Sequence, residues 1–283
     1  MRDSHSIMIS VITAAYNAAT YLPDLLESVI AQDYPHYEHV IIDDGSKDDT
    51  AALLTRYASK HPKIRWWKRE NKGQYATQND ALAAARGDYV VVIAADDILA
   101  SRDVFGKVAR FLQEKPNTEL VYGKTGRMDA RGLRLPDFEI SFRPSRWLIK
   151  QIVYAQHCSV FVSRKMILEN HLSFDPTYRY AGDWDWLVRL FHTANHIGYL
   201  KKRLSVIRIH EGQTSRWSKT HEISAEHRRV SATYGGNYSL HVLLTWANNF
   251  RAMGLLAIYA LQQEGWGAFC QRVGAWGRKR LSH

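Results

Sequence analysis

Short apolar runs alternate with amphipathic stretches through the first 123 residues, and this alternation limits the fold more than any other feature. Apolar, β-branched runs of strand length occur at 8–15, 39–44, 63–68, 89–94 and 118–123. Apolar residues recur at helical spacing over 21–32, 46–61, 73–87 and 101–115. The runs predict buried strands and the spacing predicts helices. Such alternation favours an α/β fold in which helices cover both faces of a mostly parallel sheet.

The pattern changes after Gly123. Turn residues and scattered apolar positions over 124–147 indicate irregular connections with a hairpin. The next predicted elements are a strand leading into a helix over 158–171, a helix over 183–194, and one or two strands over 196–210. From about His221 the chain is mostly helical in pattern and rich in Trp, His and Arg.

The ends of three predicted strands carry residues that are mostly polar or acidic. They are Thr13, Ala15, Tyr16, Asn17, Asp43, Asp44, Asp96 and Asp97. In sheets of this kind, ligands bind beyond the carboxyl ends of the strands. We therefore expect these residues to converge on a ligand at one edge of the sheet.

Asp96 and Asp97 follow the apolar run Val90–Ile93 after only two alanines, although two adjacent carboxylates repel each other. Burying a charge costs several kcal/mol unless the charge is paired or bound to a metal. Mg²⁺ and Mn²⁺ prefer oxygen ligands and often bridge carboxylates to phosphates. The sequence therefore predicts a divalent cation here. The alternative is that one Asp caps the following helix and the other is solvated.

The formal net charge of +10 fits nucleic acid, anionic lipid or phosphorylated ligands, and it also fits solubility alone. The first strand-to-helix turn, TAAYNAATY, contains no glycine, and the chain has no GxxxxGK[ST] segment, which excludes both common phosphate loops. Cys158 and Cys270 are too few for a disulfide framework. With no signal-like start and no long apolar run, the expected location is the cytoplasm.

Three segments together resemble the family-two glycosyltransferases, which are inverting nucleotide-sugar transferases with the GT-A fold. They are SVITAAYNAATYLPDLLESVIAQDYPHYEHVIIDDGSKDDT, ENKGQYATQNDALAAARGDYVVVIAADD and GDWDWLVRL. The resemblance implies a GT-A-like catalytic domain over 1–220, with a nucleotide-sugar-binding half over 1–123 and an acceptor and catalytic-base half over 124–220. Residues 221–283 would form a helical, basic C-terminal extension.

The resemblance also implies contacts for the donor nucleotide. Thr13, Ala15 and Tyr16 would pack around the nucleobase. Asp44 would accept a hydrogen bond from a base N–H group, as the second Asp of the family's Asp-Asp pair does. Asn79 matches the helix that borders the nucleotide.

The Asp-Asp pair matches the family's D-x-D-type motif. Asp96 would contact the ribose or the sugar, and Asp97 would ligate the metal that bridges the diphosphate. The family often has a further Asp where this chain has Ala94, so the metal has fewer protein ligands here. His210 matches a His that follows the last core strand in many members, and it would ligate the metal or touch the diphosphate. His157 precedes a predicted strand on the acceptor side.

Asp183 is the implied catalytic base. The family commonly has Glu-Asp here, and Gly182 replaces the Glu in this chain. Inversion needs one base opposite the leaving group, to take the proton of the attacking hydroxyl. Two alternatives remain open: Asp183 is a helix N-cap, or Asp185 is the base instead.

The resemblance thus implies an inverting, metal-dependent glycosyltransferase of the hexosyltransferase type, acting in bacterial cell-surface polysaccharide biosynthesis. The donor would be a UDP- or GDP-sugar, and the acceptor a glycan or lipid-linked molecule. The rival interpretation is a non-catalytic nucleotide-binding module or a basic nucleic-acid-binding module. Acidic residues at the predicted site would repel a phosphate backbone, so we expect no nucleic-acid partner.

The C-terminal extension combines Trp246, Trp266 and Trp276 with several basic residues. This composition suits an anionic membrane surface, and it predicts peripheral contact with the inner face of the plasma membrane. The alternative is that these helices cover the core and end in a solvated basic tail.

Overall fold

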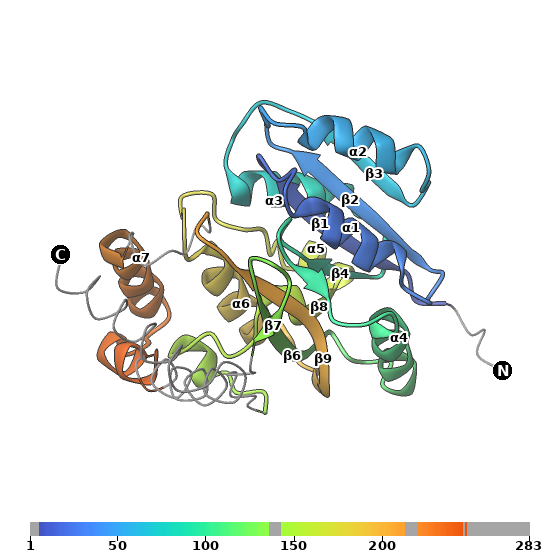
Figure 1. Cartoon of the computed structure of the whole chain (residues 1–283). Helices are drawn as coiled ribbons and strands as arrows, with labels where there is room; N and C mark the ends of the chain where they lie inside the picture. The colour runs from blue at the N-terminus through green and yellow to red at the C-terminus, as the bar shows by residue number, and fades with distance from the viewer. Residues whose placement is uncertain (1–5, 136–142, 213–219, 246, 248–283) are drawn as a thin grey trace, which may run out of the picture.

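The computed structural model describes residues 6–135, 143–212, 220–245 and 247 (Figure 1). The strands are β1 (Ile9–Ala15), β2 (Tyr37–Asp43), β3 (Ile64–Lys68), β4 (Tyr89–Val92), β5 (Ile98–Leu99), β6 (Leu120–Asp129), β7 (Arg134–Leu135), β8 (Val160–Ser163) and β9 (Ile197–Ile209). The helices are α1 (Leu22–Ile30), α2 (Thr50–Ala58), α3 (Gln74–Ala84), α4 (Val104–Glu114), α5 (Arg164–Glu169), α6 (Gly182–Thr193) and α7 (Thr220–Thr233). Short 3₁₀ turns span Leu148–Lys150 and His157–Ser159.

The described strands form one sheet in the order β3-β2-β1-β4-β8-β6-β9-β5, with β7 beside β6. The pairs among β3, β2, β1 and β4 are parallel, and β6 is parallel to β9. β8 runs antiparallel to β4 on one side and to β6 on the other. The α/β class with a mostly parallel sheet is thus confirmed, and the hairpin expected within 124–147 is β6–β7.

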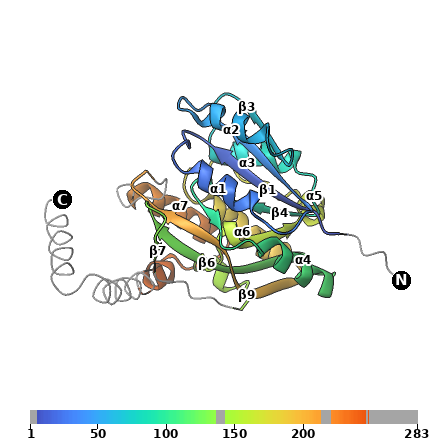
Figure 2. The same cartoon turned by 45° about the vertical axis from the view of Figure 1, so that its right-hand side comes forward.

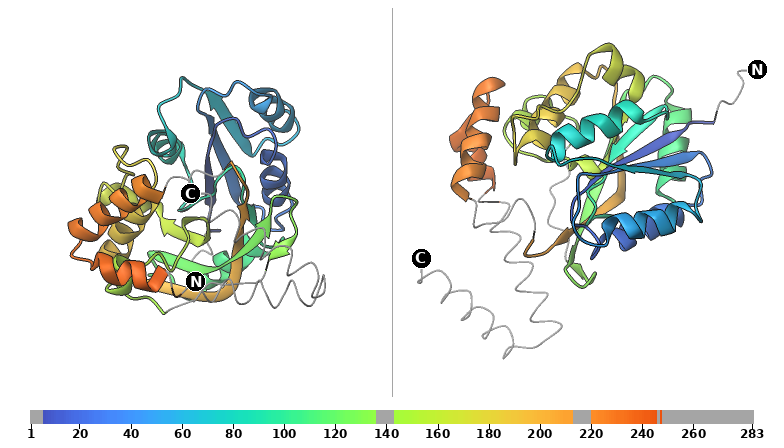
Figure 3. Two further views of the ribbon diagram at one scale, coloured as in Figure 1. Left: turned by 60° about the vertical axis from the view of Figure 1, so that its left-hand side comes forward. Right: turned by 90° about the horizontal axis from the view of Figure 1, so that it is seen from above.

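Helices cover both faces of the sheet (Figure 3). On one face, α1, α2 and α4 pack against apolar side chains such as Val11 and Ile41. On the other, α3, α5 and α6 pack against the alternate residues, such as Ile12 and Ile42. Successive side chains of a strand point to opposite faces, so a strand covered on both sides must be apolar throughout. This is why the strands were visible in the sequence as continuous apolar runs.

One expected element differs from the structure. The helix expected over 73–87 ends at Ala84, because residue Ala85 is already extended. Gly87 does not end the helix but packs against β1, where its N–H donates to Ser10 Oγ over 2.8 Å. The one or two strands expected over 196–210 are a single strand, β9, paired with both β6 and β5.

Helix α7 agrees with the expected helical extension, and it lies beside α6 (Figure 2). The basic, Trp-bearing stretch on which the membrane hypothesis depends falls at 246 and 248–283, which lie outside the described residues. Among the helices that the structure describes, none is long and apolar enough to cross a bilayer.

Two glycine-to-alanine variants test the close contact between Gly87 and the start of β1. A Cβ atom at Gly87 would lie 2.7 Å from Ser10 N and 2.8 Å from Met8 O, and backbone atoms yield little. Overpacking of this kind costs about 1–3 kcal/mol, so Gly87→Ala should lower the free energy of unfolding by that amount. Gly106→Ala is the control, because a Cβ there meets nothing closer than 3.6 Å within α4. It should stabilise the protein by about 0.5–1 kcal/mol. Equal effects of the two variants in urea unfolding would contradict this packing.

Candidate active site

Acidic and imidazole side chains gather at the carboxyl edge of the parallel strands. Asp96 and Asp97 follow β4, and β9 ends next to them with Arg208 and His210. Asp183 comes from the first turn of α6. Three separate segments therefore supply these residues, and the expected convergence of the strand ends is seen for the β4 carboxylates.

Asp97 is a buried carboxylate beside a second one. Its side chain is 5% exposed, and its Oδ1 atom accepts the backbone N–H of Arg208 over 3.0 Å. Burial, and then the charge of Asp96, raise the pKa of Asp97 to about 8. The Oδ2 atom has no hydrogen bond within the described part of the chain. A cation is the natural partner for such an oxygen, so the residues fit a bound divalent metal.

The guanidinium group of Arg208 contacts several separate parts of the site. The residue is 2% exposed, and its Nη2 atom is 2.6 Å from Asp24 Oδ2 on α1. Its Nε donates to the carbonyl oxygen of Asp96 over 3.1 Å, and its Nη1 to that of Ala130 over 3.3 Å. The guanidinium also lies 4.7 Å above the ring of Tyr21. Its charge is thus committed within the protein, and it fixes the loop that carries the two carboxylates.

His210 is held by two hydrogen bonds. Its Nε2 atom is 2.9 Å from Asp96 Oδ2, and its Nδ1 accepts the N–H of Gly212 over 3.2 Å. Because Nδ1 accepts, the tautomer assigned from these bonds carries its proton on Nε2 and donates it to Asp96. His210 therefore orients Asp96 in this arrangement. No group of three or more His, Cys, Asp or Glu side chains in the described ranges could hold a metal alone.

Asp183 lies in the first turn of α6, and its side chain is 29% exposed. Its Oδ1 atom accepts the N–H of Trp184 over 2.8 Å, and its Oδ2 lies 3.5 Å from His157 Nδ1. Burial alone would raise the pKa of Asp183, but contact with His157 and the Trp184 N–H outweigh it and lower the pKa. The N-cap of α6 is Ala181, so the interpretation of Asp183 as an N-cap is wrong.

His157 is influenced by both acidic groups, Asp183 and the carboxylate pair. Its side chain is 14% exposed, and neither ring nitrogen has a hydrogen-bond partner among the residues that the structure describes. Burial lowers its pKa, but contact with Asp183 and the charges of Asp97 and Asp96 raise it overall. His157 therefore connects Asp183 electrostatically with the carboxylate pair.

Asp185 is bound in a different environment. It is 3% exposed, its Oδ2 atom is 2.6 Å from Arg189 Nη2, and its Oδ1 accepts the Tyr234 hydroxyl proton over 2.7 Å. A carboxylate engaged on both oxygens is a poor candidate for a base. The rival assignment of Asp185 is therefore disfavoured.

Two residues expected at the nucleotide have side chains committed elsewhere. Thr13 is fully buried and donates its hydroxyl proton to Ile93 O over 2.9 Å. The Asn79 side chain forms two hydrogen bonds with the backbone of Phe174, of 2.9 and 2.7 Å. Both side chains position neighbouring segments, and their contact with a nucleotide stays a prediction.

The other nucleotide candidates lie at the strand ends as expected. Ala15 is buried, whereas Tyr16 is 51% exposed and offers an aromatic face. Asp44 is 3% exposed, and its two oxygens accept the N–H groups of Lys72 and Gly73 over 3.0 and 2.9 Å. Its Oδ1 atom also pairs with Arg69 Nε over 3.3 Å. Asp44 therefore shapes the loop before α3, and its contact with a nucleobase stays a prediction.

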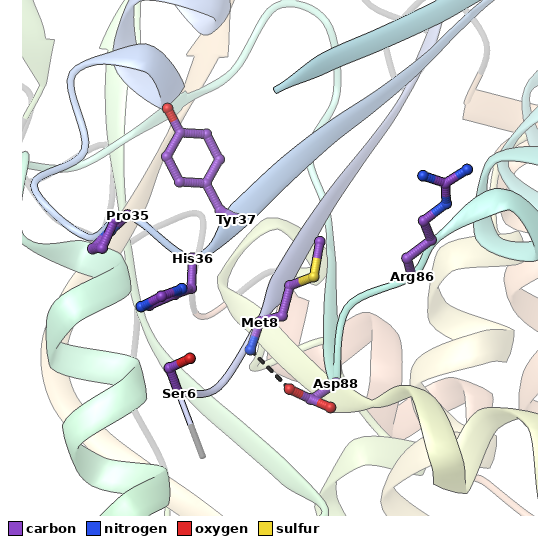
Figure 4. A pocket seen from close by; sticks show the side chains of 7 residues that line it. All are labelled: Ser6, Met8, Pro35, His36, Tyr37, Arg86 and Asp88. Atoms are coloured by element: carbon purple, nitrogen blue, oxygen red, sulfur yellow. Dashed lines mark hydrogen bonds between the residues drawn. The ribbon is translucent and has the colours of Figure 1, made fainter. Parts of the chain in front are cut away.

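A surface hollow lies at the opposite edge of the sheet (Figure 4). It is lined by Ser6, Met8, Pro35, His36, Tyr37, Arg86 and Asp88, close to the amino ends of β1, β2 and β4. In it, the N–H of Met8 donates to Asp88 Oδ2 over 2.8 Å. Because none of the acidic cluster contributes to this hollow, we do not connect it with the candidate site.

Comparison with protein families identifies the chain. The model of "Glycosyl transferase family 2" matches residues 10–170, which is more than half of the sequence. The chain belongs to glycosyltransferase family 2. The match ends before Asp183 and the whole of α6, so it covers the carboxylate pair and His157 but not the expected base.

Several relatives of this family 2 chain have names linked to the cell envelope. A putative teichuronic acid biosynthesis glycosyltransferase, TuaG of Bacillus subtilis, is 37% identical over 109 residues, covering 38% of this chain and 43% of TuaG. The poly(ribitol-phosphate) β-N-acetylglucosaminyltransferase TarS of Staphylococcus aureus is 25% identical over 197 residues, covering 69% of this chain and 34% of TarS. The matched region is thus less than half the length of these relatives.

Solved structures share the fold. A 1–349 fragment of S. aureus TarS in complex with UDP-GlcNAc has a TM-score of 0.66 at 20% identity, covering 91% of this chain and 76% of that one. The mannosyltransferase PcManGT of Pyrobaculum calidifontis, in complex with GDP-Man and Mn²⁺, has a TM-score of 0.61 at 19% identity, covering 99% and 82%. The expected GT-A fold of this family 2 chain is thereby confirmed.

Some residues that organise the site were not found from the sequence. Asp24 and Tyr75 lie within the quoted segments but received no role there, and Glu226 lies outside them. Each acts on a partner far along the chain. The one local signal was Gly182, an unexpected glycine where the family has Glu. The structure explains it, because a Cβ atom there would lie 2.6 Å from the ring of Tyr75.

The raised pKa of Asp97 predicts a stability that depends on pH. Between its ordinary pKa of about 4 and its folded value of about 8, the folded state holds a proton that the unfolded state lacks. Stability should therefore fall as pH rises through this range. Asp97→Asn removes this penalty, so it should stabilise the metal-free protein more at pH 8 than at pH 5.5. The expected difference is at least about 1.4 kcal/mol, since one pKa unit corresponds to that energy.

Urea unfolding at both pH values measures this difference. Asp33→Asn is the control, since Asp33 is exposed and its removal should change stability by less than about 0.5 kcal/mol. The same gain for Asp97→Asn at both pH values would show that the folded protein does not hold Asp97 protonated.

Proposed function

We propose that this chain is an inverting glycosyltransferase that moves a sugar from a UDP- or GDP-sugar to a hydroxyl group of a glycan or lipid-linked acceptor, in bacterial cell-surface polysaccharide biosynthesis. One observation carries the proposal. Asp183, whose pKa is lowered, has its Oδ2 atom 3.5 Å from His157 Nδ1, and the charges of Asp97 and Asp96 also act on His157. A base of this kind, in one site with a buried carboxylate pair that fits a cation, supports the two requirements of glycosyl transfer, activation of the acceptor and neutralisation of the leaving group.

The donor occupies the carboxyl edge in this proposal. The exposed ring of Tyr16 stacks on the nucleobase beside Ala15, and Asp44 accepts a base N–H group through a lone pair that the Lys72 and Gly73 amides leave free. Asp96 accepts a hydroxyl of the ribose or the sugar. The complexes of the two structural neighbours with UDP-GlcNAc and with GDP-Man support a nucleotide-sugar donor without selecting the base.

Asp97 and Asp96 would hold Mn²⁺ or Mg²⁺, together with oxygens of the diphosphate. When bound, the metal neutralises the charge that develops on the departing diphosphate. His210 orients Asp96 for this task and would become a ligand only after giving up its hydrogen bond to that carboxylate. The Mn²⁺ complex of PcManGT supports the choice of a divalent cation.

Asp183 acts as the general base. Its Oδ2 atom takes the proton of the acceptor hydroxyl while the hydroxyl oxygen forms a bond to the anomeric carbon. The bond from that carbon to the diphosphate oxygen breaks with its electron pair, and the proton remains on Asp183. His157 keeps Asp183 ionised, and the Trp184 N–H fixes its other oxygen.

The acceptor class is supported by the names of two relatives and by the net charge of the chain. The names of TuaG and TarS refer to teichuronic acid and poly(ribitol-phosphate), which are anionic polymers, and the net charge of +10 suits such an acceptor. The rival function as a nucleic-acid-binding module is disfavoured, because the candidate site concentrates carboxylates. A module that binds nucleotide without catalysis remains the second candidate, and it predicts no turnover.

Asp183→Asn tests the base. The amide keeps an acceptor for the Trp184 N–H but cannot take a proton, so turnover should fall by at least about 10²-fold while donor affinity is unchanged. Turnover is measured as release of UDP or GDP from UDP-GlcNAc or GDP-mannose, with water as the acceptor. Asp185→Asn is the matched control on the same helix turn. It should lower stability, because Asp185 pairs with Arg189, but not the turnover of folded protein. Near-normal turnover by Asp183→Asn would refute the assignment.

Metal dependence has its own test. Calorimetry of UDP and of GDP, with Mn²⁺ and with EDTA, should show binding that is strong only with the metal, because without it the diphosphate lacks a counter-charge and is repelled by Asp96. Asp97→Asn should reduce the affinity in Mn²⁺ to the level seen in EDTA. Equal affinity of the unmodified chain in both conditions would remove the metal from the account.

A further inference from the structure

Helix α7 delivers a carboxylate to the backbone that precedes α6. Glu226 Oε1 accepts the N–H of Arg179, and Oε2 accepts those of Tyr180 and Ala181, each over 2.8 Å. Ala181 is the N-cap residue of α6, and Asp183 follows it by two positions. One side chain from a later helix therefore holds three successive amides next to the expected base.

Helix α6 has no capping side chain of its own that could accept these N–H groups. The first amides of a helix lack intrahelical acceptors, and a polar side chain at the N-cap commonly supplies one. Here the N-cap is Ala181, which offers no such group, and Gly182 has no side chain. Position 182 has no room for one either, since the ring of Tyr75 lies 2.6 Å from where a Cβ would be. The Tyr75 hydroxyl instead accepts the Gly182 N–H over 3.0 Å.

Further contacts fix α7 against the same segment. Arg229 Nη2 is 3.1 Å from Asp175 Oδ2, and its guanidinium lies 4.1 Å above the ring of Tyr178. His227 contacts the ring of Trp184 edge-on, with ring centroids 5.3 Å apart. Helix α7 therefore contacts the chain before and after Asp183. Glu226 is the contact that reaches the backbone, at residues 179–181.

We propose that Glu226 is a positioning residue for Asp183, so that the first helix of the C-terminal extension takes part in catalysis. The proposal rests on the function of Asp183 as the base. Glu226 acts by holding the amides of 179–181, which sets the first turn of α6 and thus the direction of the Asp183 carboxylate. A misplacement of about 1 Å at a reacting group can reduce a rate by about 10²-fold.

The charge of Glu226 acts on Asp183 separately from its geometry. A negative group near Asp183 raises the pKa of that carboxylate, so removing the charge makes an already ionised Asp183 a slightly weaker base. Glu226→Gln and Glu226→Ala lose the same charge, so an equal loss of turnover in both would report the charge and contradict a role in geometry.

Variants of Glu226 in the full-length chain test the proposal. Glu226→Ala loses all three acceptor contacts, and Glu226→Gln keeps one oxygen. Turnover of UDP-GlcNAc or GDP-mannose with Mn²⁺ should fall in that order, by about 10²-fold for Ala and less for Gln. Mn²⁺-dependent UDP or GDP affinity should not change. Hydrogen exchange at the amides of 179–181 should accelerate in step with the loss of turnover.

Glu222→Ala is the matched control. Glu222 lies one turn away on α7 and bonds the Tyr180 hydroxyl, but none of these amides. It should retain turnover. Faster amide exchange in Glu226→Ala with normal turnover would show a structural role only, and an equal loss in Glu222→Ala would show that any damage to α7 suffices. Either result overturns the proposal.

Two further comparisons complete the test. If Glu226→Ala does not fold, Glu226→Gln decides alone, and turnover equal to that of the unmodified chain overturns the proposal. Asp183→Asn is measured in parallel. Full activity of Asp183→Asn removes the base and with it the premise of the positioning role, whereas no turnover by the unmodified chain removes the proposed function. An inactive Asp183→Asn beside fully active Glu226 variants removes only the positioning role.

Discussion

The burial of Asp97 beside Asp96 is the constraint on which the arrangement of the site depends. Two carboxylates at the end of a buried strand are unfavourable unless cations and donors surround them. The chain meets this requirement with Arg208, His210 and His157, which come from β9 and from the turn before β8. These residues lie more than 50 positions from the pair in sequence. The second half of the sheet is therefore as necessary to the pair as the strand that carries it.

The pKa values of two carboxylates in the same site are shifted in opposite directions. Burial and a like charge raise the pKa of Asp97, whereas a His and a backbone amide lower the pKa of Asp183. Divergent pKa values within one site are typical of groups with different tasks. Both carboxylates raise the pKa of His157, so ionisation of either one affects the same ring. The segments before and after Gly123 are thus joined at this site by electrostatics as well as by the sheet.

The strands were predictable because burial on both faces requires apolar runs, and the carboxylates because they interrupt such runs at strand ends. Thr13 and Asn79 were assigned to the nucleotide because their places on β1 and α3 suggest it. A place on an element does not determine the direction of a side chain, and here both turn to backbone carbonyls or amides. Asp24 and Glu226 were not predictable, since their partners are distant and no local pattern marks them.

The central claim is that Asp97 is held protonated until a cation arrives. Labelling of the side-chain carboxyl carbon (Cγ) of aspartate with ¹³C measures this directly by NMR titration. The Asp97→Asn variant assigns the signal. In the metal-free protein the Asp97 signal should titrate at about pH 8. With Mg²⁺ and UDP it should already be that of an ionised carboxylate at neutral pH, because the cation favours the charged form. A metal-free signal that titrates near the ordinary aspartate value of about 4 would contradict the account.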